Sequence, residues 1–361
     1  MRLFWKVLIK TFLTHGHQVI CVVPYGDKES DSDLLPLGVG LIHYNLDRKG
    51  LNPLKDLRSS LELGKIFHDE KPDLLFASTI KPVIYGSIAA KISRVPRIFA
   101  AITGLGFVFE ADSFLKKIIN LLGRTLYRVA LANISGVFFQ NRDDLALFKS
   151  LGLIKNVPVF MARGTGVDID HFSPAPFPDD GNCVFLLVAR LLEAKGLREY
   201  AEAARILASK WPNARFQLVG PKEKGPGAID ESSLDSWIKD GIIEYLGETR
   251  DVRPFLAASH VAVLPSWREG LPTSIMEAMA MGRPVVLADS PGCRELVKPG
   301  ENGFLAVCRD ASSLAEEMEK FLLGPELIAK MGKKSRELAC QHYDAELVAR
   351  HMYEIMIASG T

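Results

Sequence analysis

Two glutamates and the turn between them point most directly to chemistry in this chain. Glu269 and Glu277 are separated by seven residues, and a Gly-Leu-Pro turn follows the first. The second lies in a helix predicted over 274–281, where Pro272 fits the first turn and Thr273 can satisfy a free backbone amide. A helix start presents unpaired N–H groups and the positive end of a dipole, which suits a phosphate. The two carboxylates could therefore flank a phosphorylated ligand.

Two cations form a second candidate site upstream. Residues 184–188 are an apolar run typical of a strand, and Arg190 and Lys195 follow it on a loop that opens a helix. Such cations can neutralise a diphosphate, arginine as a fork and lysine as a point charge. The glutamates likewise follow a predicted strand, 261–265, and open α/β sheets bind ligands at the carboxyl ends of their strands. The alternative for both pairs is ordinary surface charge.

Strands alternate with helices in both halves of the chain, which predicts α/β domains with parallel, doubly wound sheets. The 361 residues suggest two such domains. A linker rich in Gly and Pro covers 164–178, and a second α/β series runs from 182 to about 309. In the first half, strands are expected within 15–24 and at 40–44, 71–76, 97–102 and 136–139, with helices at 1–13, 51–68, 84–92 and 114–132. Helices at 312–323, 325–342 and 345–358 close the chain.

Composition excludes several classes of protein. The net charge of +1 gives no argument for a nucleic-acid partner. Five scattered cysteines, without a Cys-x-x-Cys, indicate a reducing compartment and neither a disulfide framework nor a zinc site. No transmembrane helix or cleavable signal is evident. The two Asp-x-Asp runs, at 31–33 and 168–170, fall in a polar loop and in the linker, so no metal and no cofactor is expected.

Several blocks around these residues resemble one enzyme family. The Glu-x₇-Glu motif, the blocks 265–270, 292–297 and 300–305, the Arg-x₄-Lys-Gly of 190–196 and the Gly-Val-Asp segment of the linker are similar to those of the family-four retaining glycosyltransferases. The resemblance spans nearly the whole chain. It implies a GT-B fold, in which two Rossmann-like domains with parallel sheets enclose a cleft.

The resemblance also implies roles for single residues. Arg190 and Lys195 would stabilise the diphosphate that leaves with growing negative charge. Glu277 is expected on the ribose hydroxyls, and Glu269 on the hydroxyls of the donor sugar, where it orients the sugar. The family retains the anomeric configuration, by front-face attack in which a donor phosphate oxygen takes the acceptor proton. Further donor-binding residues are expected to be Gly270, Leu271, Pro272 and Thr273 around the glutamates, and Gly220 and Arg250 near the base.

Segments of the first half resemble a bacterial subgroup of that family. The segments 79–86, 102–109 and 139–144 are similar to those of enzymes that add N-acetylhexosamine or hexose to undecaprenyl-diphosphate-linked sugars, in O-antigen, capsule or glycan assembly. On the acceptor side, Lys81 could meet a diphosphate, and Gly104 and Gly106, beside Thr103, allow close backbone approach. The alternative is a loop lysine and plain turn glycines.

The resemblance divides the chain into two domains. Residues 1–165 would form the acceptor-binding domain, with the last helix, 345–358, packing back on it, and 166–344 would bind the nucleotide sugar. A GT-B chain opens with a strand and a Gly-rich loop, whereas this sequence opens directly on a helix. We therefore expect the N-terminal sheet to lack a central strand.

Two basic helices raise the question of a membrane. Arg2, Lys6 and Lys10 accompany Phe4, Trp5 and Phe12, and Lys116, Lys117, Arg124 and Arg128 accompany the apolar residues of 114–127. Cationic helices with aromatic residues can lie on an anionic membrane face. The alternative is a solvated basic face over a packed one. A lipid-linked acceptor favours peripheral contact with the inner membrane face and a cytoplasmic location.

The expected function is transfer of a sugar from a UDP-sugar to a lipid-diphosphate-linked saccharide, by a metal-independent glycosyltransferase of bacterial polysaccharide synthesis. Two alternatives stay open: a UDP-sugar 2-epimerase, which shares the fold, and a nucleotide-sugar-binding remnant without catalysis. The sequence leaves open the sugar, the linkage, the acceptor glycan, the oligomeric state and the activity of a chain without its opening strand.

Overall fold

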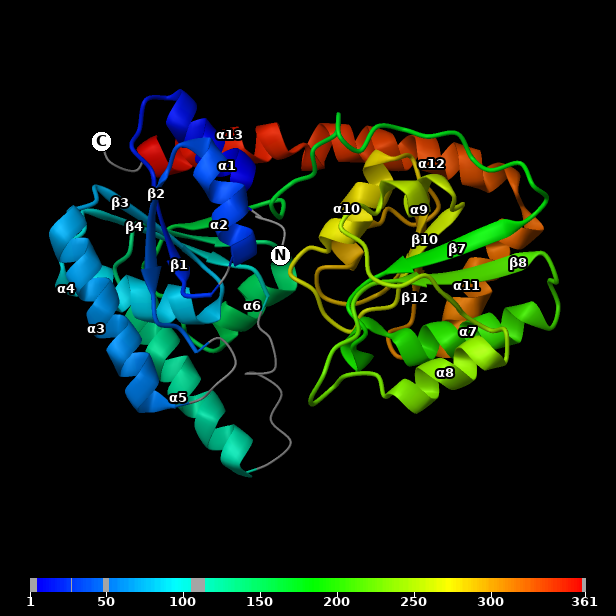
Figure 1. Ribbon diagram of the computed structural model, residues 1–361, viewed down its shortest axis with the longest axis horizontal. Helices are drawn as coiled ribbons and strands as arrows, with labels where there is room; N and C mark the ends of the chain where they lie inside the picture. Colours follow the sequence, from blue (N-terminus) through cyan, green and yellow to red (C-terminus); the bar gives the residue numbers. More distant parts are fainter. Residues whose placement is uncertain (1–4, 27, 48–51, 105–113, 359–361) are drawn as a thin grey trace. The chain divides into compact units, whose positions relative to one another are not determined.

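The computed structural model describes residues 5–26, 28–47, 52–104 and 114–358 (Figure 1). The chain forms two compact units. Unit 1 comprises Met1–Thr165 and Glu346–Thr361, and unit 2 comprises Gly166–Ala345. The arrangement is α/β in both, and every ladder between the described strands is parallel.

Unit 1 contains two separate sheets, of order β1-β2 and β3-β4-β5-β6. Among the strands described, no ladder joins these two sheets. The strands are β1 (Ile20–Pro24), β2 (Gly40–Tyr44), β3 (Leu74–Ser78), β4 (Arg97–Ile102), β5 (Gly136–Phe139) and β6 (Val159–Met161). The helices are α1 (Lys6–Thr14), α2 (Lys28–Leu34), η1 (Leu35–Leu37), α3 (Pro53–Glu70), η2 (Pro82–Gly86), α4 (Ser87–Ile92), α5 (Phe114–Leu131), α6 (Arg142–Ser150) and α13 (Ala345–Ala358).

Two apolar clusters hold unit 1 together, one on each side of β4. One contains α3, α4 and α5, with Phe67, Tyr127 and Phe148 among its buried residues. The other joins α1 to α13 over the opposite face, through Leu8 and Met352. Figure 1 shows α1 and α13, at the two ends of the colour scale, lying side by side. The end of the chain is therefore part of the core of its first half.

Unit 2 has one sheet of six strands in the order β12-β11-β10-β7-β8-β9. Figure 1 shows α9, α10 and α12 on one side of this sheet and α7, α8 and α11 on the other. The strands are β7 (Cys183–Val188), β8 (Ala214–Val219), β9 (Glu244–Tyr245), β10 (Val261–Leu264), β11 (Val285–Ala288) and β12 (Gly303–Ala306). The helices are η4 (Glu193–Lys195), α7 (Leu197–Ala208), α8 (Glu231–Lys239), α9 (Arg253–Ala257), α10 (Thr273–Ala280), η5 (Arg294–Leu296), α11 (Ala311–Leu323), α12 (Glu326–Leu338) and η6 (Ala339–Tyr343).

The central strands of unit 2 are apolar because helices cover both of their faces. β10 and β11 are buried at every residue, and β7 at its four middle residues. An arginine, Arg283, is also fully buried here among backbone carbonyls. The Arg283 guanidinium donates to the carbonyls of Ala175, Pro176, Leu256 and Ala257 and stacks on Phe177. Burial lowers the pKa of Arg283 to about 10. It anchors the linker to the sheet.

Candidate active site

The loop after β7 is shaped by a glycine. η4 ends at Gly196, whose φ of +73° is left-handed. A Cβ atom there would lie 2.2 Å from the carbonyl oxygen of Pro265, at the end of β10. Only glycine therefore lets the turn that carries Lys195 approach the neighbouring strand so closely.

Hydrogen bonds tie that turn to the loop after β10. The carbonyl of Ala194 accepts from the backbone N–H of Trp267 at 2.9 Å and from the hydroxyl of Ser266 at 3.0 Å. The Trp267 indole donates to Glu199 on α7, and the guanidinium of Arg309 stacks on its ring at 4.0 Å. The two loops thus form one piece, although they are far apart in the sequence.

Lys195 and Glu269 meet at this junction. Their ammonium and carboxylate groups form an ion pair, and the side chains are only 19% and 14% exposed. Nearby, burial raises the pKa of the Cys293 thiol to about 12, with a smaller contribution from the Glu269 carboxylate. Because water is largely excluded, the charges interact more strongly than they would on an open surface.

The loop after β11 holds Glu269 from the other side. The N–H of Glu269 donates to the carbonyl of Pro291 at 2.9 Å. Gly292 has a φ of +80°, and a Cβ atom on it would lie 2.4 Å from the Glu269 carbonyl oxygen. The Ser290 hydroxyl bonds the carbonyl of Ser266 at 2.6 Å. Loops from three adjacent strands therefore fix the backbone of this glutamate.

Glu277 lies inside α10 and is buried, at 4% exposed. The helix begins one residue earlier than predicted, at Thr273, and Pro272 stands at the N-cap instead of in the first turn. The expected capping by Thr273 is wrong, because its hydroxyl makes no hydrogen bond within the described part of the chain. Leu271 packs into the core beside this helix start. The N–H of Ile275 already donates to the carbonyl of Pro272, so without a side-chain cap the donors of the first turn that suit another acceptor are the N–H groups of Thr273 and Ser274.

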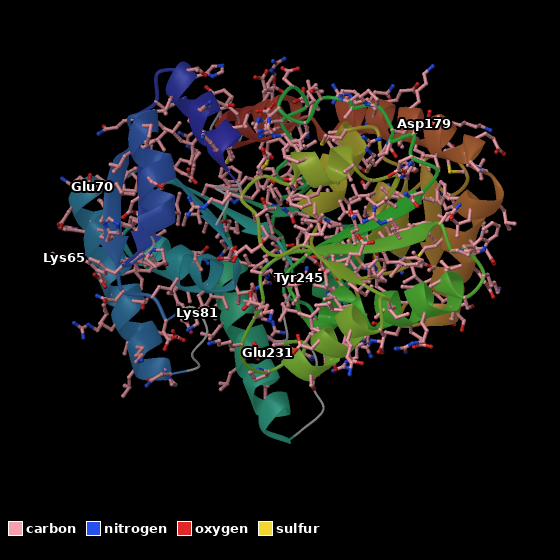
Figure 2. The ribbon with its side chains drawn as sticks, turned by 45° about the vertical axis from the view of Figure 1, so that its right-hand side comes forward. Lys65, Glu70, Lys81, Asp179, Glu231 and Tyr245 are labelled. Carbon is pink, nitrogen blue, oxygen red and sulfur yellow. The ribbon has the colours of Figure 1, made fainter. Side chains whose placement is uncertain are left out.

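The ends of β8 and β9 complete this edge of the sheet. Gly220 has a φ of +150°, and a Cβ atom on it would lie 1.8 Å from the carbonyl oxygen of Ala189. Its own carbonyl accepts from the hydroxyl of Tyr245, labelled in Figure 2, at 2.9 Å. Gly220 is thus required for the close approach of the two loops, and Arg250 is exposed beyond β9.

Arg190 has a partner that the sequence did not single out. Its guanidinium donates to the Glu223 carboxylate at 3.1 Å, while the arginine side chain stays 57% exposed. The structure thus brings Lys195 and Glu269 into direct contact and pairs Arg190 separately. Trp267, Arg309 and Glu223 were missed as site residues; the only signal was Trp267 standing two residues before Glu269.

The acceptor-side residues predicted in unit 1 have a different environment. Lys81, labelled in Figure 2, forms an ion pair with Asp56 at 2.6 Å, and both side chains are largely buried. The Tyr85 hydroxyl donates to the other carboxylate oxygen, and burial and this carboxylate raise the pKa of Tyr85. The predicted diphosphate-binding lysine is thus held in a packed ion pair, which also differs from the loop lysine that was the alternative.

Of the other residues predicted in unit 1, some lie in the described part of the chain and some lie outside it. Gly104 has a left-handed φ of +125° and follows Thr103 at the end of β4, whereas Gly106 lies outside the described residues. Trp5 and Phe12 pack against Phe76 and Tyr353. On α5, Arg128 bonds backbone carbonyls at the end of α6. Arg2, Phe4 and the side chains of Lys116 and Lys117 lie outside the described part.

None of the described helices combines the length and apolarity needed to cross a bilayer. In the same residues, no group of three or more His, Cys, Asp or Glu side chains is placed to hold a metal ion.

The α/β architecture of the two units, with parallel strands in all three sheets described, is that of the GT-B glycosyltransferase fold. Residues 182–323 match the family model "Glycosyl transferases group 1", and residues 2–141 match "Glycosyl transferase 4-like". The two matches take in most of the chain, which belongs to this glycosyltransferase family.

Individual relatives agree with the family. The N,N'-diacetylbacillosaminyl-diphospho-undecaprenol alpha-1,3-N-acetylgalactosaminyltransferase of Campylobacter jejuni is 27% identical, over 98% of this chain and 94% of the relative. The UDP-Gal:alpha-D-GlcNAc-diphosphoundecaprenol alpha-1,3-galactosyltransferase of Escherichia coli is 29% identical, over 73% and 70%. Among solved structures, Anabaena HepE in complex with UDP-glucose is similar in fold, with a TM-score of 0.76, 20% identity and coverage of 98% and 96%.

Proposed function

We propose that this glycosyltransferase moves an N-acetylhexosamine or hexose from a UDP-sugar to a lipid-diphosphate-linked saccharide, with retention of configuration, in bacterial surface polysaccharide synthesis. The ion pair of Lys195 with Glu269 is the observation that carries the proposal. It sets a cation and a carboxylate in direct contact at the carboxyl edge of a parallel sheet, where sheets of this kind bind nucleotides.

In the proposed donor site, each part of the UDP-sugar is bound by different residues. Lys195, Arg190 and the uncapped start of α10 would neutralise the diphosphate as its bond to the sugar breaks. Glu277 would accept hydrogen bonds from the ribose hydroxyls, and Glu269 from those of the sugar. Gly220 and Arg250 would line the base. A donor phosphate oxygen would take the proton of the attacking acceptor hydroxyl on the same face, which retains the configuration.

The acceptor class rests on the named relatives. The names of the C. jejuni and E. coli enzymes both include a sugar linked to diphospho-undecaprenol. The sugars that these names give as transferred are N-acetylgalactosamine and galactose respectively. Both the acceptor and the range of sugars are therefore proposed by analogy. The proposed acceptor-side residues are Lys81, Thr103, Gly104 and Gly106.

A lipid-linked acceptor also motivates peripheral contact with the cytoplasmic face of the membrane. Leu121 and Leu122 on α5 are 65% and 59% exposed, next to the cation of Arg124. An exposed apolar pair with basic neighbours suits an anionic membrane surface. Trp5 and Phe12 make no such contribution, because both are packed within unit 1.

A two-stage experiment tests the function. Thermal unfolding is first followed with UDP, GDP, dTDP, UDP-GlcNAc, UDP-GalNAc, UDP-glucose and UDP-galactose, because a ligand of the folded state raises its stability. The UDP-sugar that raises Tm is then assayed for transfer to a lipid-diphosphate-linked saccharide, and the product anomer is determined by NMR. An inverted product would refute retention. UDP binding without transfer would indicate a remnant, and turnover without any acceptor an epimerase.

A further inference from the structure

Two side-chain contacts connect the segment after β7 to the loop after β10. One is the ion pair of Lys195 with Glu269. The other is the hydrogen bond that the Trp267 indole N–H donates to the Glu199 carboxylate at 2.9 Å. Along the chain, Glu199 follows Lys195 by about one helical turn, in the first turn of α7. Because Trp267 stands just before Glu269, the second contact joins the same two segments as the ion pair.

A cation from a third loop covers the ring of Trp267. The guanidinium of Arg309, which follows β12, lies 4.0 Å from the centroid of this ring. Within the described part of the chain, that guanidinium forms no ion pair. Donation of the indole N–H to a carboxylate raises the electron density of the ring, which strengthens its attraction for a cation. Glu199, Trp267 and Arg309 therefore support one another, and we call them the Trp267 cluster.

The backbone of Arg309 is held in a strained conformation. Its φ is +64°, in the left-handed region that favours glycine. A tight turn fixes it, because Asp310 donates its N–H to the carbonyl of Val307 and caps α11 through the N–H of Ser313. Such strain costs stability and is found mainly at functional sites. In the described structure, the contact with Trp267 is what the arginine provides at this position and a glycine would not.

The carboxylate of Glu199 depends on the indole of Trp267. Its Oε1 atom accepts the indole N–H, whereas its Oε2 atom is buried and has no hydrogen-bond partner in the described structure. Loss of the indole N–H would leave the whole carboxylate without a hydrogen bond, which is unfavourable for a buried charged group. The Trp267 ring is therefore held firmly in one orientation.

We propose that Glu199, Trp267 and Arg309 are positioning residues, which hold the Glu269 carboxylate in the place that sugar transfer requires. The inference rests on the proposed function, in which Glu269 binds the sugar and Lys195 the diphosphate. The cluster acts on Glu269 because only one residue separates it from Trp267. A small displacement of a group that holds the substrate lowers the rate by a large factor. UDP has no sugar, so its affinity should not depend on the cluster.

The first test compares two arginines with nearly the same backbone conformation. Arg309→Gly relieves the strain and removes the cation from the ring, and Arg94→Gly makes the same backbone change at φ +59° on an exposed turn of unit 1. Both variants should keep Tm within about 3 °C of the parent, because glycine adopts this conformation freely. With the UDP-sugar that raises Tm in the panel above, kcat should fall by about tenfold in Arg309→Gly only. Arg309→Lys keeps a cation and should retain most of kcat.

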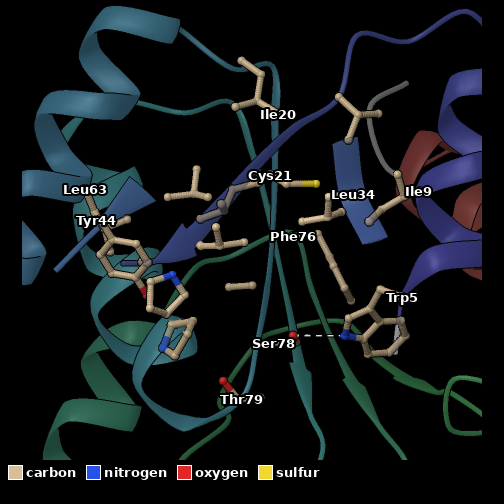
Figure 3. A pocket seen from close by; sticks show the side chains of 18 of the residues that line it. Trp5, Ile9, Ile20, Cys21, Leu34, Tyr44, Leu63, Phe76, Ser78 and Thr79 are labelled. Carbon is tan, nitrogen blue, oxygen red and sulfur yellow. Dashed lines mark hydrogen bonds between the residues drawn. The ribbon is translucent and has the colours of Figure 1, made fainter. Parts of the chain in front are cut away.

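The second test removes the indole N–H. Trp267→Phe keeps an aromatic ring under Arg309 but leaves Glu199 without its donor. Trp5 is the matched control, because its indole also donates to one side chain, the hydroxyl of Ser78 at 3.0 Å, as drawn in Figure 3. Trp267→Phe should lower kcat by about tenfold, and Trp5→Phe should leave it unchanged. The Kd of UDP, measured by calorimetry, should change by less than about threefold in both variants.

Equal kcat values in folded Arg309→Gly and Arg94→Gly would overturn the positioning role. So would a loss of UDP affinity as large as the loss of kcat, because the cluster would then support the whole site instead of placing Glu269. Lys195→Met in the same assay separates this inference from the proposed function. Full kcat in Lys195→Met would refute the proposed donor site, and the positioning role with it. Loss of kcat in Lys195→Met but not in the cluster variants would refute the positioning role alone.

Discussion

Lys195 and Glu269 are 74 residues apart in the sequence and form a largely buried ion pair. The lysine is already neutralised by a carboxylate before any phosphate arrives. A diphosphate that binds Lys195 must therefore compete with Glu269 or bind beside it. In the first case, binding of the diphosphate to Lys195 would free the Glu269 carboxylate to bind the sugar. Recognition of the diphosphate and recognition of the sugar would then be coupled.

Replacing Lys195 by Met should show whether the ion pair contributes to the stability of the protein, to its activity, or to both. The variant leaves Glu269 without its cation, so both stability and activity should fall, activity by about 10²–10³-fold. Adding Glu269→Gln should restore Tm but leave kcat/KM low. Unfolding curves and transfer kinetics on the same three proteins measure this. Recovery of activity in the double variant would contradict the assignment of Lys195 to the donor site.

Glu277→Gln should weaken use of the donor without unfolding the protein. The amide is nearly isosteric with the buried carboxylate, but it binds ribose hydroxyls less strongly than a charged acceptor. We expect affinity for the UDP-sugar to fall by about 10–100-fold, measured by calorimetry. Glu316→Gln, on the exposed side of α11, is the matched control and should change nothing. Unchanged affinity in the Glu277 variant would contradict its assignment.

Two glycines with nearly the same backbone conformation make a controlled comparison. Gly292 and Gly300 have φ values of +80° and +78°, but only Gly292 lies against Glu269, and nothing is within 4 Å of a Cβ atom on Gly300. Gly→Ala at either position should cost about 1–2 kcal/mol for the left-handed backbone. Gly292→Ala should also displace Glu269, so its kcat should fall at least tenfold relative to Gly300→Ala. Equal kcat values would refute a role for this contact.

Because His260 is buried, we expect the protein to lose stability in mild acid. Its Nδ1 accepts from the N–H of Val184, and its Nε2–H donates to the carbonyl of Pro178. Burial, as the largest cause, lowers the pKa of His260 below 6.5. The unfolded chain therefore binds the proton more readily, and stability should fall as the pH drops through 6.5 toward the lowered pKa.

The variant His260→Gln keeps an acceptor and a donor but cannot titrate. Its free energy of unfolding, from urea titrations across that range, should depend less on pH than that of the parent. His351→Gln, at an exposed position on α13, should keep the parent's pH dependence. An identical slope in both variants would exclude His260 as the cause.

The sequence predicted local elements well where apolar periodicity was strong. β10, β4 and β5 lie within a residue of their expected bounds, because fully apolar runs are characteristic of buried parallel strands. α2, a polar run of Lys, Glu, Ser and Asp, carries no such pattern and was missed, as was β6, which has only three residues.

The site could be predicted only in part, for a physical reason. Motif spacing placed Glu269 and Lys195 on loops at the carboxyl ends of strands and Glu277 in the helix that follows. The partners of these and other charges depend on loops that meet in space, so neither the bond of Arg190 to Glu223 nor that of Lys81 to Asp56 could be read from spacing. Pro272 was misplaced by one residue because helix boundaries are set by local hydrogen bonds.

The two points where the chain passes between its units lie together. Val167 donates to the carbonyl of Tyr343, and Ala345 donates to the carbonyl of Val167. A Cβ atom on Gly166 would lie 2.4 Å from the Cα of Ala345. Residues 166–345 are therefore one continuous segment whose two ends meet, and unit 1 takes its segments from both sides of it. A gene fragment for unit 2 would be one uninterrupted stretch, whereas a fragment for unit 1 would have to join Thr165 to Glu346.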